Sequence, residues 1–108
     1  MKHPRVSIMM NAVYHKDPAA LKNILKDPNS NPNEEDFLGL SPLHVECYIG
    51  AAECARVLML DKRTDLFRRG PCDITPYESA LKGGNEDCSS LFYDPEIVDL
   101  HWHNNPTN

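Results

Sequence analysis

Long hydrophobic runs are missing from this 108-residue chain, since no stretch approaches the roughly 18 apolar residues of a membrane-spanning helix. The opening MKHPRVSIMMNAV has basic residues but lacks the apolar core, roughly 7–15 residues long, of a secretory signal peptide. Cysteine is present four times, yet no two cysteines form a C-x-x-C pair and no spacing fits zinc. We therefore expect reduced thiols and a cytoplasmic, possibly nuclear, location without membrane contact.

Catalytic motifs are also missing. The sequence has no glycine-rich phosphate loop, no nucleophile elbow and no evident acid–base carboxylate pair. We accordingly predict that the protein is not an enzyme and carries no cofactor. The net charge of −5 argues against general nucleic-acid binding. Residues 1–33 hold five basic and two acidic residues, a net of +3, whereas residues 83–108 hold five acidic residues and no Lys or Arg. We interpret the acidic end as a solvated face.

A repeat is what the sequence does contain. Similar segments begin at Ser7, Ser41 and Thr75, so the two intervals are equal. A fixed period of about 34 residues is typical of stacked supersecondary units. Nine prolines are many for this length and indicate frequent breaks between short elements.

Helix start and stop signals recur within each unit. Ser41-Pro42 and Thr75-Pro76 each put a capping hydroxyl before a proline at the first helical position. Gly50 and Gly84 fit a helix end that turns into the left-handed region. Asp17-Pro18 starts a second helix in the first unit by the same device. Apolar residues at helical spacing predict the second helix of each unit: Leu21, Ile24 and Leu25, then Ala55, Leu58 and Met59, then Phe92 and Tyr93.

These motifs resemble the ankyrin repeat. Ser-Pro-Leu-His at 41–44, followed by Gly50 and preceded by Asp36 and Gly39, is similar to the family signature D-x-x-G-x-T-P-L-H…G. The third unit resembles it less, because Tyr77-Glu78 replaces Leu-His, and the first unit shares mainly Ser7 and Ala12. The resemblance covers roughly residues 5–93 and implies that His44 hydrogen-bonds within and between turns.

The expected fold is all-α: an ankyrin-repeat solenoid of stacked helix-turn-helix units with short hairpin-like loops and a C-terminal capping helix. We divide it into repeats at 1–36, 37–70 and 71–93, the last partial, and a tail at 94–108. Asp94-Pro95 restarts a helix in the tail, whose apolar side chains Ile97, Val98, Leu100 and Trp102 can cover the exposed end of the third unit. The alternatives are a linear motif for a partner or the start of a further region.

The resemblance also implies a protein-binding surface, formed by a concave face and the loop tips. The matching positions are Tyr14, His15, Phe37, Leu38, Leu40, Tyr48, Ile49, Pro71, Cys72, Ile74, Lys82 and Gly83. Five of these positions belong to the middle unit: Phe37, Leu38, Leu40, Tyr48 and Ile49. All five residues are apolar or aromatic, which is typical of an interaction site if they face solvent. The alternatives are a register shifted by one residue or coverage by the tail. Arg68 and Arg69, with Lys62 and Arg63, form a basic run that suits either a solvated loop or an acidic partner.

We therefore expect a monomeric intracellular adaptor or inhibitor that binds one protein partner. Small cellular regulators and pathogen proteins directed at a host both use this format. The first alternative is the ankyrin portion of a larger protein whose function lies elsewhere. The second is a metal-responsive protein that uses His3 near the amino terminus or the pair His101 and His103.

Overall fold

A computed structural model describes residues 7–103 of the chain, without the side chains of Trp102 and His103. Within that range the fold is all-α, with seven α-helices and two short 3₁₀ turns and no strand. The α-helices are α1 (Ile8–Tyr14), α2 (Pro18–Leu25), α3 (Pro42–Ile49), α4 (Ala52–Met59), α5 (Pro76–Lys82), α6 (Glu86–Ser89) and α7 (Pro95–His103), and the 3₁₀ turns are η1 (Pro71–Asp73) and η2 (Ser90–Tyr93).

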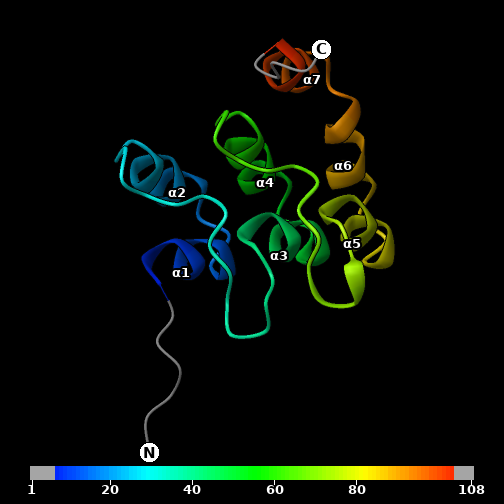
Figure 1. Cartoon of the computed structure of the whole chain (residues 1–108), viewed down its shortest axis with the longest axis horizontal. Coiled ribbons are helices and arrows are strands. Elements are labelled where there is room, and N and C mark those ends of the chain that lie inside the picture. Colours follow the sequence, from blue (N-terminus) through cyan, green and yellow to red (C-terminus); the bar gives the residue numbers. More distant parts are fainter. Residues whose placement is uncertain (1–6, 104–108) are drawn as a thin grey trace, which may run out of the picture.

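Consecutive helices form antiparallel pairs, and the pairs lie side by side. Figure 1 shows α1, α3 and α5 in one row and α2, α4 and α6 in a second row above it. Each helix of the first row packs on its partner in the second row and on the next helix along its own row. The main hydrophobic core lies between the rows and includes the fully buried Leu21, Leu43, Leu58 and Met59.

The three pairs share one backbone hydrogen bond at the turn between their helices. In each case an N–H that follows the first helix donates to a carbonyl within that helix. The bond joins Asp17 N to Ala12 O at 3.0 Å, Ala51 N to Glu46 O at 2.9 Å and Asn85 N to Ala80 O at 2.9 Å. Because donors and acceptors both recur at the interval of the sequence repeat, the sequence period corresponds to a repeated backbone geometry.

The same turn needs a left-handed residue in all three pairs. Lys16, Gly50 and Gly84 have φ values of 52°, 82° and 68°. Glycine enters this region without steric penalty, whereas a side chain with a Cβ is disfavoured there. The first pair therefore makes the turn with a strained lysine.

The hydroxyls of Ser7, Ser41 and Thr75 cap the first helix of each pair. They accept from Met10 N at 2.9 Å, from His44 N at 3.3 Å and from Glu78 N at 3.2 Å. Each bond satisfies one of the N–H groups that a helix start leaves without an intrahelical partner. Pro42 and Pro76 occupy the first helical position, where a missing N–H does no harm.

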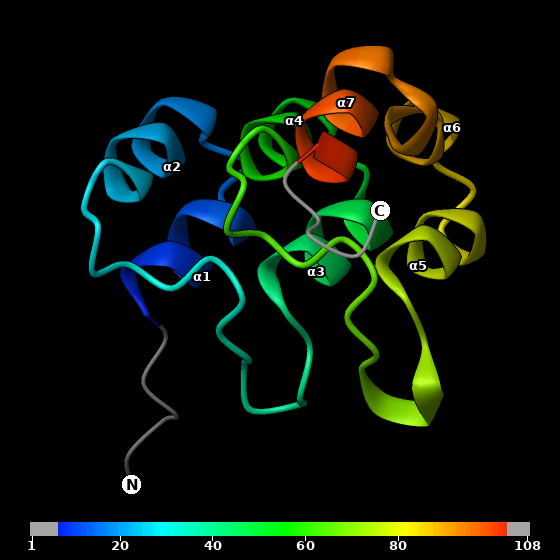
Figure 2. The same ribbon diagram turned by 45° about the horizontal axis from the view of Figure 1, so that its top comes forward.

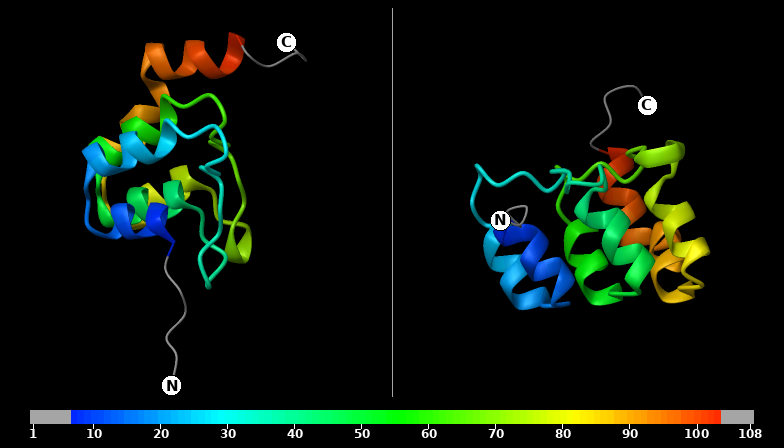
Figure 3. Two further views of the ribbon diagram at one scale, coloured as in Figure 1. Left: turned by 90° about the vertical axis from the view of Figure 1, so that its left-hand side faces the viewer. Right: turned by 90° about the horizontal axis from the view of Figure 1, so that it is seen from below.

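The C-terminal helix differs in position from the sequence-based prediction, which puts it over the outer end of the third unit. Figures 2 and 3 show α7 lying on the second row, between α4 and α6. The Arg56 guanidinium in α4 donates to Asp94 at 2.7 Å and to Glu96 at 2.8 Å. Ile97 is completely buried in the main core. The second helix of the third pair is short and ends in η2, which turns the chain back over α4.

We predict that Lys16→Gly increases the free energy of unfolding by about 0.5–1 kcal/mol, because it removes the left-handed strain. The matched variant Gly84→Ala places strain at the equivalent position of the third pair. A Cβ at Gly84 would have no atom within 4 Å, so only the backbone effect remains. We expect Gly84→Ala to lose about 1 kcal/mol in urea unfolding. A loss of stability in Lys16→Gly would contradict this account.

Candidate functional site

Two finger loops extend from the helix pairs beyond the first row (Figure 2). We define the first as residues 34–41 and the second as residues 68–75. Each closes with one hairpin-like hydrogen bond, from Asp36 N to Leu40 O in the first and from Gly70 N to Ile74 O in the second, both at 2.8 Å. Donors and acceptors are again separated by the repeat interval, so the finger loops share one geometry.

The carboxylate of Asp36 shapes the tip of the first finger loop. Its Oδ1 accepts from Leu38 N at 2.8 Å and from Leu40 N at 2.9 Å, while its Oδ2 accepts from the Tyr14 hydroxyl at 3.1 Å. An aspartate that bonds to the backbone two residues on fixes a turn locally. Burial and the bond to Asp36 raise the pKa of the Tyr14 hydroxyl. The tip is thus tied to α1.

The structure separates the five apolar residues of the middle unit into two groups. Phe37, Leu38 and Tyr48 are exposed, at 72%, 59% and 60% of their surface. Leu40 and Ile49 are half-buried and pack against a second cluster formed by Met10, Val13 and Val45. The prediction that all five face solvent is therefore wrong for Leu40 and Ile49. The turn at Asp36 directs Leu40 inward, and Ile49 falls on the inner side of α3.

The remaining predicted residues lie at several places on the surface. Cys72 and Lys82 are exposed, whereas Ile74 is half-buried. His15 is exposed, and its Nδ1 lies 2.8 Å from the carbonyl oxygen of Asn11. Tyr14 is 43% exposed beside the first finger loop. The structure therefore brings Tyr14, at the end of α1, beside Phe37 in the first finger loop, while Cys72 lies on the second finger loop and Lys82 at the end of α5.

Two exposed aromatic residues were missed by the sequence reasoning. Tyr93, placed among the apolar residues of the third unit's second helix, is 71% exposed. Phe67 is 63% exposed and directly precedes the second finger loop. Its N–H donates to Asp65 Oδ1 at 3.0 Å, which holds the backbone at this point. The signal lay in the sequence, since Phe67 stands next to the basic residues in a loop, but it matches none of the family positions.

His44 joins the middle unit to the second finger loop. The ring is buried, with Nε2 2.8 Å from Ile74 O and Nδ1 2.8 Å from Ser41 Oγ. A carbonyl only accepts, so we assign the ring proton to Nε2 from its partners, and Nδ1 accepts from Ser41. With both ring nitrogens bonded, the histidine holds one turn against the next.

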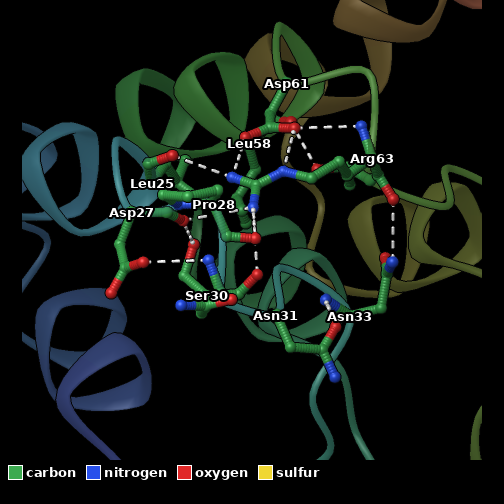
Figure 4. Close-up of polar contacts among 11 residues, drawn as sticks. Leu25, Asp27, Pro28, Ser30, Asn31, Asn33, Leu58, Asp61 and Arg63 are labelled. Carbon is green, nitrogen blue, oxygen red and sulfur yellow. Dashed lines mark hydrogen bonds and ion pairs between the residues drawn. The ribbon is translucent and has the colours of Figure 1, made fainter.

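Two of the four residues in the basic run, Arg63 and Arg68, are held by other parts of the chain. Figure 4 shows the side chain of Arg63, from the loop after α4, reaching the loop that follows α2, where its guanidinium donates to Leu25 O at 2.8 Å and to Ser30 O at 3.0 Å. The same group bonds the Asp61 carboxylate at 2.7 Å and lowers the pKa of that carboxyl. Arg68 pairs with Glu35 at 2.7 Å across the two finger loops. Both arginines therefore have structural partners.

A buried carboxyl was also unforeseen. Glu46 in α3 is fully buried, and neither side-chain oxygen has a partner among the described residues. Burial raises the pKa of Glu46 well above its ordinary value. The equivalent positions hold Ala12 and Ala80, so a repeat position that suits a small side chain carries a glutamate here.

Two thiols lie near Glu46. The Cys88 thiol donates to Glu46 O at 3.8 Å, and its hydrogen bond with Cys47 lowers its pKa. Burial raises the pKa of Cys54 to about 11, which leaves a poor nucleophile. No group of three or more His, Cys, Asp or Glu residues in the described range is placed to hold a metal ion. His101 Nε2 donates to Met59 O at 2.7 Å, while His3 and the His103 side chain lie outside the described residues.

Comparisons with models of known protein families and with curated proteins give no match to this chain. No helix in residues 7–103 has the length and apolar character required to cross a membrane. The functional proposal therefore depends on the residues and their geometry.

We predict that Arg63→Lys lowers the free energy of unfolding by about 1–3 kcal/mol, because a single ammonium group cannot replace the planar fork at Leu25, Ser30 and Asp61. The matched control is Arg69→Lys. Arg69 is exposed and makes one bond, to Asp73 O at 3.2 Å, so we expect a change within about 0.5 kcal/mol. Equal losses in the two variants, measured by urea unfolding, would disprove a structural role specific to Arg63.

We predict that Glu46→Ala increases the free energy of unfolding at pH 7 by about 1–3 kcal/mol, because it removes a buried group without a partner among the described residues. The folded protein keeps the Glu46 proton to higher pH than the unfolded chain does, so wild-type stability falls as pH rises above the unfolded pKa of about 4.3. We expect this fall to be smaller in Glu46→Ala.

Thermal unfolding of both proteins between about pH 5 and pH 8 tests this linkage. Glu34→Ala is the control, since Glu34 is only partly buried, in the first finger loop. It should leave the wild-type pH dependence intact. A Glu46→Ala profile parallel to that of wild type would rule out a buried, protonated carboxyl.

Proposed function

We propose that this chain is an ankyrin-type repeat protein that binds another protein through the tips of its finger loops and the adjacent first row of helices. Support for the repeat type comes from the three helix pairs, which share one sequence period, a common turn hydrogen bond and a common capping hydroxyl. The hairpin-like finger loops are a further shared feature with the family pattern.

The observation that carries the binding role is the exposure of Phe37, Leu38 and Tyr48. Covering large apolar side chains that otherwise face water is favourable, and aromatic anchors often dominate the binding energy of an interface. Because the unusual residues of this surface are large apolar or aromatic side chains and include no carboxylate, histidine or cysteine, we propose binding rather than catalysis.

The finger loops are also held in place before any partner arrives. Asp36 fixes the first tip through Leu38 N and Leu40 N, and His44 holds the second through Ile74 O. The Arg68–Glu35 pair joins the two loops. An ordered loop loses less conformational entropy on binding, so this arrangement favours affinity.

Within this class, we propose an adaptor or inhibitor that acts in the cytoplasm or nucleus. All four cysteines are free, and three of them are buried in the core as small apolar side chains. Compartments that keep thiols reduced suit such a composition. The same binding surface would serve equally if the chain works as a module of a longer protein.

We predict that Phe37→Asp abolishes capture of the partner while the free energy of unfolding changes by less than about 0.5 kcal/mol. The immobilised chain would be exposed to extract from the cells that express it, and retained proteins compared by quantitative mass spectrometry. Tyr93→Asp is the matched control, because Tyr93 is 71% exposed at the far end of the third pair. A protein retained by wild type and by Tyr93→Asp but lost with Phe37→Asp is the expected result.

Two further variants separate binding from folding. Tyr48→Ala should weaken capture without a loss of stability, whereas Leu58→Ala in the core should cost about 2–5 kcal/mol. Loss of stability in Phe37→Asp comparable to that of Leu58→Ala would identify Phe37 as a packing residue. A wild-type chain that retains nothing, or a partner that still binds both Phe37→Asp and Tyr48→Ala, would contradict the proposed function.

A further inference from the structure

The outer side of the second row has two grooves, and the chain fills one of them itself. Helix α7 lies over α4 and α6 (Figure 3), with its acidic first turn paired to Arg56 and Ile97 fully buried. His101 completes the contact by donating to Met59 O at 2.7 Å. The filled groove thus shows what kind of helix packs on the second row. Such a helix has carboxylates at its start and a branched aliphatic residue shortly after them.

The neighbouring groove, between α2 and α4, is open. It forms a hollow of about 620 Å³, with Leu25, Val57 and Leu60 among its lining residues. Leu25 and Val57 are half-buried, and Leu60 is 37% exposed. Two lysines, Lys22 and Lys26, border this apolar floor from the α2 side.

The two grooves correspond through the repeat. Lys22 and Arg56 occupy equivalent positions of successive units, as do Leu25 and Met59. Arg56 pairs with the acidic first turn of α7, and its equivalent in the open groove, Lys22, is also a cation. Neither Lys22 nor Lys26 forms a salt bridge with another described residue, so both charges remain available.

The acidic residues of the open groove limit how a ligand can lie in it. Asp61 is held by Arg63 at 2.7 Å, and Arg56 is engaged by α7. Glu53 is exposed on the first turn of α4 and would repel a carboxylate placed on that side. The carboxylates of a bound helix must therefore face α2, where Lys22 and Lys26 lie.

We propose that the groove between α2 and α4 binds an amphipathic helix of a partner protein, with carboxylates in its first turn facing Lys22 and Lys26 and a branched aliphatic side chain over Leu25, Val57 and Leu60. This site is separate from the finger loops, so it does not depend on the function proposed above. The partner helix would lie beside α4 as α7 does on its other side, and would extend the third layer of helices.

The probe is a synthetic peptide of residues 94–103, DPEIVDLHWH, which contains α7 and the Asp94 that precedes it. The chain's own α7 occupies the filled groove at a high effective concentration, so free peptide should bind the open groove instead. We expect saturable shifts of the Lys22, Lys26, Val57 and Leu60 amides in ¹⁵N-labelled full-length chain at millimolar peptide. Lys22→Glu combined with Lys26→Glu should raise the Kd about tenfold or more, as lost attraction becomes repulsion.

Controls separate this groove from general charge effects. Lys62→Glu changes an exposed lysine outside the groove and should leave the Kd unchanged. A peptide with Asp94→Asn and Glu96→Gln should bind more weakly than the parent peptide. Binding that is unaffected by either the groove variant or the neutral peptide would overturn the proposal, as would the absence of saturable shifts.

Two other occupants give different results. Shifts confined to α7, Arg56 and Met59 would mean that the peptide replaces the chain's own helix, and would overturn the proposal. A dimer in sedimentation at the same concentration, abolished by the groove variant, would identify the α7 of a second copy as the occupant and would also overturn it. A monomer with shifts in the open groove supports a partner helix.

Discussion

Helices of four to nine residues are too short to persist alone in water, and every α-helix described here falls in that range. Their stability must come from packing between pairs, which requires each pair to present the same face to the next. The shared turn meets this requirement. It places the N–H of Asp17, Ala51 and Asn85 against the equivalent carbonyl of the preceding helix, so each second helix leaves its first helix in the same direction. The core between the rows depends on this common direction of the second helices.

Sequence reasoning recovered the features that depend on local chemistry. The caps at Ser41 and Thr75 and the left-handed glycines follow from residues within one turn of each other, and the period follows from the recurrence of these signals along the chain. The direction of Leu40 and Ile49 did not follow, because Leu40 has the same apolar character as Leu38 and only the turn made by Asp36 distinguishes them. The packing position of α7 could not be predicted from the sequence either. Asp94-Pro95 indicates where a helix starts, but not which groove that helix occupies.

The charged residues are distributed in a way that suits the two proposed binding surfaces. Arg56, Arg63 and Arg68 all form ion pairs within the chain, and Arg63 also closes the loop that follows α2. Arginine suits these roles because its planar fork binds several acceptors at once. Among residues 7–103, the cations outside these ion pairs are Arg69 and the lysines, whose ammonium groups are strongly hydrated. The surface therefore offers apolar finger tips on one side and a lysine-edged groove on the other.

With α7 over the second row, the outer end of the third pair needs another cover, and aromatic rings supply part of it. Tyr77 lies edge to face with Phe92 at 5.4 Å between ring centroids and with Tyr93 at 6.1 Å. The hydroxyls of Tyr77 and Tyr93 are 3.3 Å apart, so polar atoms meet where the rings face water. Tyr77 is half-buried, whereas Tyr93 stays 71% exposed, so the rings cover this end only in part. The outer end of the third pair therefore remains partly exposed, and α7 packs along α4 instead, through Arg56 and Met59.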